Sequence, residues 1–263
     1  MAVLELSGVT KRFGGLTAVS DFNIAIQEGE LVGLIGPNGA GKTTVFNLIT
    51  GMYAPTSGTI EFLGERVDGK KPFEIARRGI ARTFQNLRLF KSLTALQNVA
   101  IARQLESRYS FFDAAFRTRA FRAEEKRVIK DSLELLELVG LGDKAYEKAK
   151  NLPYGYQRKL EIARALSLNP KLLLLDEPAA GMNPEESLSL MDFIEDIQEK
   201  FGVTIFLIEH HMEVVMGICD RIVVLNFGCT IAEGTPLEVQ ENEEVIKAYL
   251  GEVQNDNESN AQG

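Results

Sequence analysis

The sequence predicts an α/β fold in which helices cover a mainly parallel sheet, and three patterns support this prediction. Short, mainly apolar runs at 31–35, 172–175 and 203–208 are typical of parallel strands that are buried on both faces. Segments with a helical period lie between these runs, as expected of a parallel sheet with flanking helices. Two segments with apolar and polar residues in alternation, 3–7 and 22–26, come first and predict a small N-terminal antiparallel β subdomain.

A glycine-rich loop, residues 36–43, joins the first buried run to an apolar segment with a helical period. Its glycines lack side chains, so backbone N–H groups can converge on a phosphate at the positive end of the following helix. Lys42 offers a charge to phosphate oxygens, and the Thr43 hydroxyl suits Mg²⁺. An ordinary glycine turn is the alternative, but every fixed position of a P-loop is filled, which predicts a P-loop NTPase core. The nucleotide-binding residues expected in the loop are Gly36, Asn38, Gly39, Ala40, Gly41, Lys42, Thr43 and Thr44.

Composition limits the class of protein. With 263 residues and 45% apolar content, the chain can bury a full core as one large domain or as one domain with an inserted lobe. No window approaches the ~18 to 20 apolar residues of a membrane span, and the N-terminus lacks an export signal, so we expect a cytoplasmic chain. Two cysteines, Cys219 and Cys229, make no disulfide framework, which fits a reducing compartment. The net charge of −8 argues against a nucleic-acid partner.

From about residue 90 to 168 the pattern changes to long helices, which predicts an inserted helical subdomain after a small β segment at 58–64. Its longest helical stretch is 124–138. Basic and aromatic side chains are interleaved within it: Arg103, Arg108, Arg117, Arg119, Arg122, Lys126, Arg127 and Lys130, with Phe111, Phe112, Phe116 and Phe121. Such a face can lie against lipid or a membrane partner, although a solvated amphipathic helix is the more frequent explanation.

The rest of the chain returns to an α/β pattern. We expect a helix at 155–168, a strand at 171–175, a helix after Asn183-Pro184, a strand at 203–208 and a hairpin formed by 222–225 and 229–232. Residues 252–263 are polar with few apolar side chains, which predicts a disordered tail. The expected organisation is therefore one P-loop NTPase domain over 2–251 that contains the helical insertion.

The strand at 171–175 ends in two carboxylates, Asp176 and Glu177. Downstream of a P-loop this is the arrangement of a Walker B motif, in which Asp176 holds Mg²⁺ through its shell of ligands. Glu177 is then placed to polarise the water that attacks the γ-phosphate. A solvated acidic strand end is common by itself, but the preceding P-loop favours a catalytic site.

These motifs, with Gln85 between them and His210 at the end of the next strand, resemble an ABC-type ATPase, the nucleotide-binding subunit of a transporter. The resemblance covers residues 2–250 and implies ATP and Mg²⁺ as the ligands. It implies that Gln85 links Mg²⁺ and the water to a membrane partner, and that His210 contacts the γ-phosphate. Phe13 stands where the family places an aromatic ring against adenine. Alone, a Gln on a loop, a His after a strand or one Phe would more often be structural.

Two motifs depart from the family pattern. The family signature Leu-Ser-Gly-Gly-Gln is replaced by Leu152-Pro153-Tyr154-Gly155-Tyr156, and Pro153 has neither the hydroxyl nor the N–H that the family's serine offers to phosphate. Gly155 still allows a close approach of the backbone, and the helix N-terminus can still face an anion. In the segment after Walker B, Asn183 replaces the common Asp.

The resemblance implies a head-to-tail dimer in which each ATP lies between one subunit's P-loop and the other's signature. Lys42, Glu177 and His210 would then act on one ATP, whereas Pro153, Tyr154, Gly155 and Tyr156 would cover the ATP held by the partner. The altered signature leads us to expect two unequal sites and a paralogous ATPase partner, with a heterodimer favoured over a homodimer.

Within the family, the stretches 160–164, 178–184, 208–212 and 246–251 are most similar to the ATPases of branched-chain amino acid importers. This implies two integral membrane permease subunits, an extracytoplasmic solute-binding protein reached through them, and a position on the inner face of the cell membrane. ATPases for amides, urea or lipopolysaccharide export share much of the pattern and remain alternatives. A soluble ABC protein that acts on ribosomes or DNA, or an inactive P-loop scaffold, are further alternatives.

Overall fold

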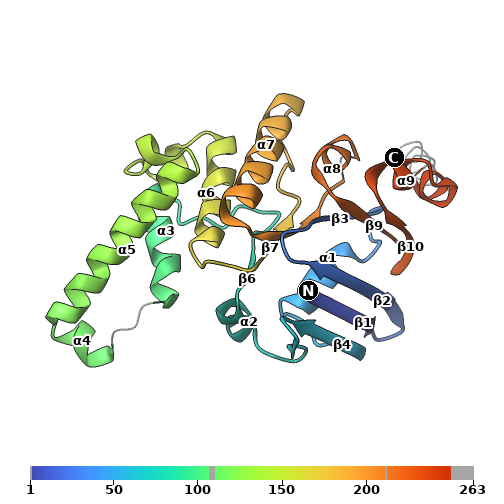
Figure 1. Ribbon diagram of the computed structural model, residues 1–263, viewed down its shortest axis with the longest axis horizontal. Helices are drawn as coiled ribbons and strands as arrows, with labels where there is room; N and C mark the ends of the chain where they lie inside the picture. Colours follow the sequence, from blue (N-terminus) through green and yellow to red (C-terminus); the bar gives the residue numbers. More distant parts are fainter. Residues whose placement is uncertain (1, 107–109, 211, 250–263) are drawn as a thin grey trace, which may run out of the picture.

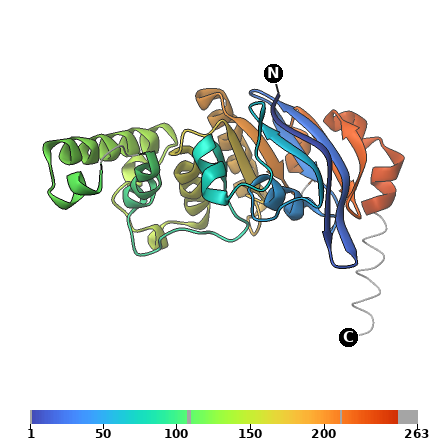
Figure 2. The same cartoon turned by 90° about the horizontal axis from the view of Figure 1, so that it is seen from below.

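Two sheets, one antiparallel and one mainly parallel, lie at one end of the molecule in a computed structural model that describes residues 2–106, 110–210 and 212–249 (Figures 1 and 2). The antiparallel sheet has the strand order β2-β1-β4-β5. Its strands are β1 (Ala2–Phe13), β2 (Leu16–Gln27), β4 (Ser57–Phe62) and β5 (Glu65–Arg66). The predicted N-terminal antiparallel subdomain is therefore confirmed, and β4 belongs to it.

The second sheet has the order β10-β9-β3-β8-β7-β6, and every neighbouring pair is parallel except β9 and β10. Its strands are β3 (Leu31–Ile35), β6 (Ile80–Arg82), β7 (Leu172–Asp176), β8 (Thr204–Ile208), β9 (Arg221–Asn226) and β10 (Cys229–Gly234). All three predicted parallel strands are present, and the expected hairpin closes one edge. The α/β class with a mainly parallel sheet is confirmed.

The α-helices with assigned bounds are α1 (Lys42–Ile49), α2 (Pro72–Arg78), α3 (Ala95–Arg103), α4 (Phe111–Ala115), α5 (Arg119–Leu138), α6 (Tyr154–Leu166), α7 (Pro184–Phe201), α8 (Met212–Ile218) and α9 (Pro236–Gln240). Short 3₁₀ turns lie at Gln104–Glu106, Gly142–Lys144 and Ala149–Asn151. Within the described part of the chain, none of the helices has both the length and the apolar character needed to cross a bilayer.

Between β6 and β7 every regular element of the described chain is helical, and these helices form a lobe at the opposite end from the antiparallel sheet (Figure 1). Helix α5 begins five residues before the predicted 124–138 segment because the Thr118 hydroxyl caps it by accepting a hydrogen bond from the Phe121 N–H at 3.3 Å. The domain limits 2–251 stay a prediction, and the predicted tail, 252–263, lies outside the described residues.

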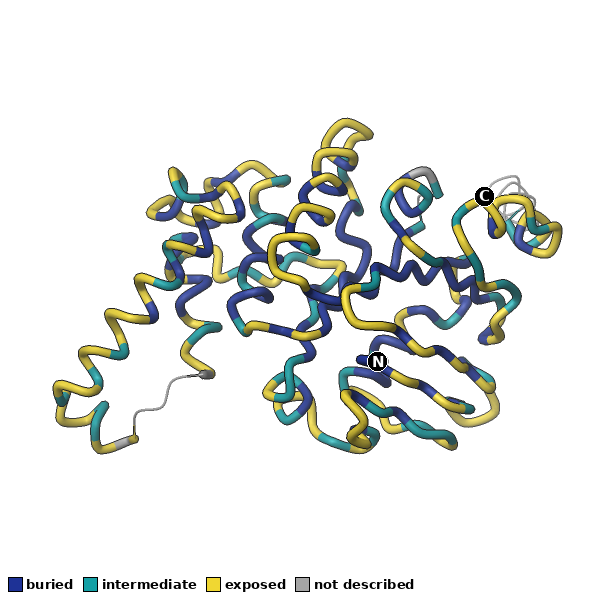
Figure 3. Tube along the Cα trace, in the orientation of Figure 1, coloured by how far each residue is buried: buried dark blue, intermediate teal, exposed yellow. Residues whose placement is uncertain are grey.

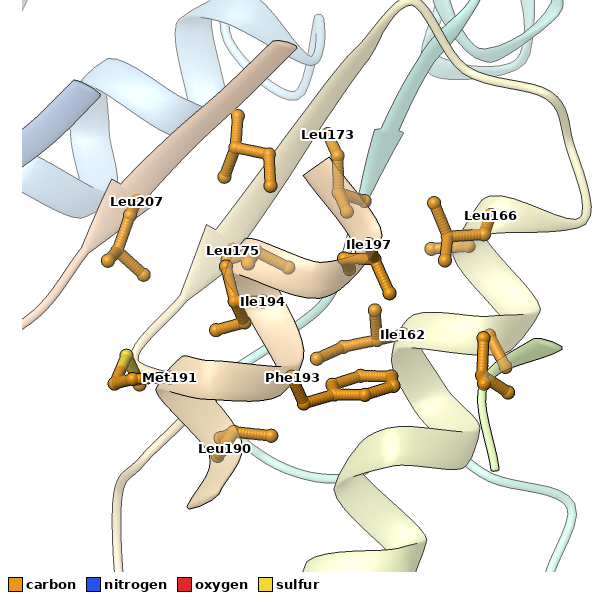
Figure 4. Packing of buried hydrophobic residues seen from close by; sticks show 14 of the residues in the cluster. Ile162, Leu166, Leu173, Leu175, Leu190, Met191, Phe193, Ile194, Ile197 and Leu207 are labelled. Atoms are coloured by element: carbon orange, nitrogen blue, oxygen red, sulfur yellow. The ribbon is translucent and has the colours of Figure 1, made fainter. Parts of the chain in front are cut away.

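The buried core joins the lobe to the parallel sheet. Successive side chains of a strand point to opposite faces, so Leu173 and Leu175 of β7 belong to a cluster with α6 and α7, whereas Leu172 and Leu174 belong to a cluster with α1 and the antiparallel sheet. Figure 4 shows the first cluster, where side chains of α6, α7 and β7 point toward one another. The lobe and the sheet therefore share one continuous apolar core.

Candidate functional site

The carboxyl ends of neighbouring parallel strands meet at one edge of the sheet. The strand β3 leads into the glycine-rich loop, β7 ends beside Glu177, β8 is followed by Glu209 and His210, and β9 leads into the turn at Phe227. A cavity of about 470 Å³ lies at this edge. Its size falls within the range of small-molecule sites.

Most of the predicted nucleotide site lines this cavity. The predicted residues in its wall are Phe13, Asn38, Gly39, Ala40, Gly41, Lys42, Thr43, Thr44, Glu177 and His210. Three predicted residues do not line the cavity: Gly36, Gln85 and Asp176. Gln85 is hydrogen-bonded to Glu177, and Asp176 is hydrogen-bonded to Arg82. Residues that the sequence reasoning missed are Leu16, Thr17, Ala18 and Phe227.

The glycines of the loop have a backbone that other residues could not adopt. Gly36 has φ of 146°, and a Cβ there would lie 2.0 Å from the Leu225 carbonyl oxygen. Gly41 has φ of 109°, and a Cβ there would lie 2.5 Å from the carbonyl oxygen of Ala18. The loop is therefore clamped between the β9 end and the β1–β2 hairpin. Only a residue without a side chain fits at these two positions.

Lys42 lies inside the curl of this loop. It is the first residue of α1 and is only 5% exposed. Its Nζ donates to the carbonyl oxygens of Gly36 at 2.5 Å and Pro37 at 3.0 Å. The ammonium group is thus held beside the backbone N–H groups at the helix N-terminus, where an anion is stabilised.

Glu177 brings the three predicted catalytic side chains together. Its Oε2 accepts a hydrogen bond from Gln85 Nε2 at 2.5 Å, and its Oε1 contacts His210 Nε2. The residue is 8% exposed and has a positive φ of 47°, while its N–H donates to the Ile208 carbonyl at 2.9 Å. A glutamate held in a left-handed conformation at a cavity wall is a strained position of the kind found at functional sites.

A buried carboxylate, Glu209, fixes the loops around this cluster. Its Oε1 accepts a hydrogen bond from the Ala179 N–H at 2.8 Å, and its Oε2 accepts one from the His210 N–H at 3.1 Å. The loops after β7 and β8 are therefore tied together directly behind the cavity. Glu209 was not predicted from the sequence. Like Asp176, it is an acidic residue that directly follows an apolar run, and this pattern could have pointed to it.

Asp176 is paired with an arginine from the neighbouring strand end. Arg82 donates to its Oδ2 at 2.6 Å, and both side chains are buried. Arg82 also donates to Asn47 Oδ1 at 2.8 Å, which links this pair to α1. Charge-assisted hydrogen bonds of this kind are shorter and stronger than neutral ones. Arg82 thereby fixes the position of Asp176 relative to α1, the helix that follows the P-loop.

The altered signature lies at the start of α6, away from the P-loop. Pro153 is the N-cap of this helix, and Pro153, Gly155 and Tyr156 line a separate cavity of about 290 Å³ together with Met182 of the loop after β7. Asn183, the other departure from the family pattern, caps α7 by accepting a hydrogen bond from the Glu186 N–H at 2.9 Å.

Tyr154 connects this region to the loop of Gln85 and to the loop after β7. Its hydroxyl donates to the Ala180 carbonyl at 2.9 Å and accepts from Arg158 at 3.0 Å. Arg158 in turn donates to the carbonyl oxygens of Phe84 at 3.0 Å and Gln85 at 2.5 Å. Helix α6 therefore holds the loop of Gln85 and the loop after β7 in one chain of hydrogen bonds.

Two aromatic side chains in the wall of the cavity are exposed to solvent. Phe13 at the end of β1 makes an edge-to-face contact with Tyr53, with ring centroids 5.1 Å apart. Phe227 lies in the turn between β9 and β10 and is 88% exposed. The signal available in the sequence for Phe227 was an aromatic residue between Asn226 and Gly228, in the turn of the expected hairpin. Both rings can offer a flat face to a planar group.

The fold and this site define a P-loop nucleotide-binding ATPase. The sequence model of the family described as "ABC transporter" matches residues 19–180, and that of "Branched-chain amino acid ATP-binding cassette transporter" matches residues 229–255. The chain belongs to the ABC transporter family of ATP-binding proteins, so the predicted resemblance and the ATPase class are confirmed.

Curated relatives are similar over nearly their whole length. The high-affinity branched-chain amino acid transport ATP-binding protein BraF of Pseudomonas aeruginosa is 48% identical over 251 residues, which cover 95% of this chain and 98% of BraF. The corresponding protein LivG of Salmonella typhimurium is 46% identical over 251 residues, with 95% and 98% coverage.

Solved structures agree with the fold. An ATP-binding cassette of an ABC transporter in its ADP conformation is 31% identical and superposes with a TM-score of 0.83 over 95% of this chain and 99% of the other. A dimeric cassette in a post-hydrolysis state bound to ADP and phosphate is 27% identical, with a TM-score of 0.73 over 89% and 98% of the two chains.

Proposed function

We propose that the chain is the ATP-hydrolysing subunit of a membrane ABC importer and couples Mg-ATP binding and hydrolysis to the uptake of branched-chain amino acids. The ATPase activity is supported by one observation above all: a single cavity is lined by Lys42, Glu177 and His210. The solute is supported by the identity to BraF and LivG, which extends over 95% of the chain.

The cavity suits a nucleoside triphosphate from end to end. The loop N–H groups and Lys42 Nζ would bind the β- and γ-phosphates, because helix N-termini and lysine charges both favour phosphate oxygens. Phe13 also lines the cavity, from the end of β1 in the antiparallel sheet, and would stack on the adenine. This division between the two sheets would orient the γ-phosphate toward Glu177.

The donor set around Glu177 fits Mg²⁺. Thr43 supplies a hydroxyl, Asp176 a carboxylate and Gln85 an amide oxygen, and all three are oxygen donors of the type that Mg²⁺ prefers. The Gln85 nitrogen donates to Glu177, so the amide oxygen is the atom that remains for a cation. A bound Mg²⁺ would neutralise charge on the phosphates.

Hydrolysis would use Glu177 as the general base. Its carboxylate would accept a proton from the attacking water, while Gln85 and His210 keep that carboxylate aimed into the cavity. His210 would also contact the γ-phosphate. The buried Glu209 would hold the His210 backbone in place throughout the reaction.

The signature would act on the ATP of a second ATPase subunit, because it lines a cavity separate from the P-loop. The dimeric cassette with ADP and phosphate supports an assembly of two subunits. Pro153 offers no N–H to a phosphate, so we propose two unequal sites and a paralogous partner. An isolated homodimer with two equally active sites would contradict this proposal.

Replacing Tyr154 with phenylalanine tests the role of α6 in this coupling. The ring would keep its contact with Arg158, but the hydroxyl's two hydrogen bonds, to the Ala180 carbonyl and from Arg158, would be lost. We expect kcat of the assembled transporter to fall roughly ten- to a hundredfold, because small displacements of reacting groups have effects of that size. The affinity of the chain for ATP should stay unchanged, since Tyr154 does not line the P-loop cavity.

The matched control is Tyr146→Phe, because Tyr146 is exposed on the same lobe. Steady-state ATPase assays and ATP titrations on the two variants separate kcat from binding. Equal kcat in Tyr154→Phe and Tyr146→Phe would show that the Tyr154 hydroxyl does not position the loops.

The permease subunits would dock between α2 and the helical lobe. A cleft of about 340 Å³ is lined there by Phe73 and Arg77 of α2, Leu105 of the lobe and Leu168 after α6. Phe73 and Leu105 are more than half exposed, and so offer an apolar surface to a partner. The solute-binding protein would be reached through the permeases, and the chain would lie on the cytoplasmic face of the membrane.

Uptake in cells tests the proposed solute. A strain that lacks this chain should lose most uptake of labelled leucine, isoleucine and valine, and the wild-type gene should restore it while Lys42→Ala should not. Recovery of two polytopic proteins and a paralogous ATPase with the tagged chain from gently solubilised membranes would support the assembly.

Unchanged uptake of the three amino acids would contradict the solute. Loss of amide or urea uptake, or of lipopolysaccharide export, would then assign the chain to a related transporter. Recovery of ribosomal or DNA-bound proteins without membrane proteins would contradict transport and leave the ATPase activity alone standing.

A further inference from the structure

The tip of the helical lobe, formed by α4 and the first three turns of α5 (residues 111–130), lies at the end of the molecule farthest from the antiparallel sheet (Figures 1 and 2). Most of its residues are exposed, as Figure 3 shows. Phe112 is 71% exposed and Phe116 is 77% exposed. Two large aromatic side chains thus project from one short helix and its C-cap.

Basic residues follow one face of α5 next to these rings. Arg119, Arg122, Lys126 and Lys130 are spaced by three or four residues, so their side chains share one face of the helix. The opposite face carries the buried Val128, Ser132 and Leu135. The basic face is therefore the outer one.

The acidic residues of the tip do not neutralise this face. Asp113 accepts hydrogen bonds from the Ser110 N–H and hydroxyl and from the Thr118 hydroxyl, and so completes the cap of α4. Glu124 pairs with Arg127 at 2.6 Å. Lys130 pairs with Glu134 at 3.4 Å, but among the described residues Arg119, Arg122 and Lys126 make no ion pair.

The tip is locally cationic on a chain whose net charge is −8. The cations within it are Arg117, Arg119, Arg122, Lys126, Arg127 and Lys130, against Asp113, Glu124 and Glu125. Of the other two basic residues noted in this region, Arg103 pairs with Asp131 at 3.0 Å and Arg108 lies outside the described residues. A cationic tip on an acidic protein favours a negatively charged partner.

We propose that this tip binds the surface of a bilayer that contains anionic lipids. Arg119, Arg122 and Lys126 would lie among the headgroup phosphates, and Phe112 and Phe116 would enter the boundary with the acyl chains. The cations are spread along successive turns of a helix instead of converging on one point, which suits a surface of many phosphates more than a single anion. Exposed aromatic rings beside basic side chains are the pattern of interfacial membrane contact.

The place of the tip in the fold agrees with this proposal. Helices α2 and α4 lie along the same edge of the molecule in Figure 1. The apolar cleft is lined in part by Phe73 and Arg77 and so lies beside α2. A subunit docked to permeases through that cleft would have its tip directed at the bilayer around them. The charge pattern of the tip does not depend on where the permeases dock. The proposal can therefore be tested with the purified chain alone.

Sedimentation with vesicles tests the proposal directly. Purified full-length protein is mixed with vesicles of equal parts phosphatidylglycerol and phosphatidylcholine, or of phosphatidylcholine alone. We expect binding to the anionic vesicles that weakens as salt rises, because screening reduces attraction between exposed charges. Arg119→Gln, Arg122→Gln and Lys126→Gln combined should weaken binding about 100-fold, since each cation near an anionic surface strengthens binding roughly fivefold.

A second variant, Phe112→Ser with Phe116→Ser, should weaken binding but keep its dependence on salt. The matched control neutralises three exposed cations elsewhere, Arg66→Gln, Lys200→Gln and Lys247→Gln, and should bind as the wild type does. Thermal melting of each variant separates lost binding from lost folding. Equal binding to both kinds of vesicle, no binding to either, or equal loss in the basic-face and control variants would overturn the proposal.

Discussion

Replacing Lys42 with alanine is expected to abolish ATP binding in the micromolar range and to remove ATPase activity. The ammonium group lies inside the P-loop, where it donates to the Gly36 and Pro37 carbonyls at 2.5 and 3.0 Å. In the complex with ATP the same charge would bind phosphate oxygens, and charged hydrogen bonds of this kind contribute about 1.5–3 kcal/mol each. Loss of two such bonds corresponds to roughly a hundredfold or greater loss of affinity.

Equilibrium binding of a labelled ATP analogue and steady-state hydrolysis measure the two effects of Lys42→Ala separately. Lys200→Ala is the control, because Lys200 is exposed at the end of α7. Within the described part of the chain, its one ion pair is with Asp196. Thermal melting shows whether the two hydrogen bonds within the loop also matter for stability. Wild-type binding and turnover in Lys42→Ala would refute the P-loop assignment.

Replacing Glu177 with glutamine is expected to leave ATP bound and almost unhydrolysed. The amide has the shape of the carboxylate but cannot accept a proton from water at neutral pH. Removing a general base typically lowers a rate by 10²- to 10⁴-fold, or about 3–5 kcal/mol in the barrier. The affinity for ATP should change little, because the P-loop and Lys42 are untouched.

Single-turnover hydrolysis in the assembled transporter, with a parallel measurement of ATP affinity, checks this result. Glu195→Gln on the exposed side of α7 removes the same charge away from the cavity and should keep wild-type turnover. Rapid hydrolysis by Glu177→Gln would remove Glu177 from the role of base. It would leave the nucleotide-binding assignment unaffected, since that assignment depends on Lys42.

The residues of the candidate site that the sequence points to are those whose signal is local. The P-loop needs glycines, a lysine and a threonine within eight positions, so strand, loop and helix are visible together. Asp176 and Glu177 are visible for the same reason, because they end an unbroken apolar strand.

Contacts between distant segments could not be predicted in this way. Arg82 and Asp176 are 94 residues apart, and their pairing depends on β6 and β7 being neighbours in the sheet. Glu209 reaches Ala179 only because the loops after β7 and β8 end at the same edge. The direction of the Tyr154 side chain likewise depends on where the loop after β7 passes α6.

The continuous core between the lobe and the parallel sheet has a mechanical consequence. Leu173 and Leu175 of β7 pack in the same cluster as the buried residues of α5 and α6, so apolar side-chain contacts connect the lobe to the parallel sheet. Helix α5 has 20 residues and so extends about 30 Å at ~1.5 Å per residue. It is a lever arm: a rotation of about 5° at its base would move its far end by roughly 3 Å over that length. Small movements of the loops that hold the nucleotide would thereby reach the edge of the molecule as displacements of atomic size.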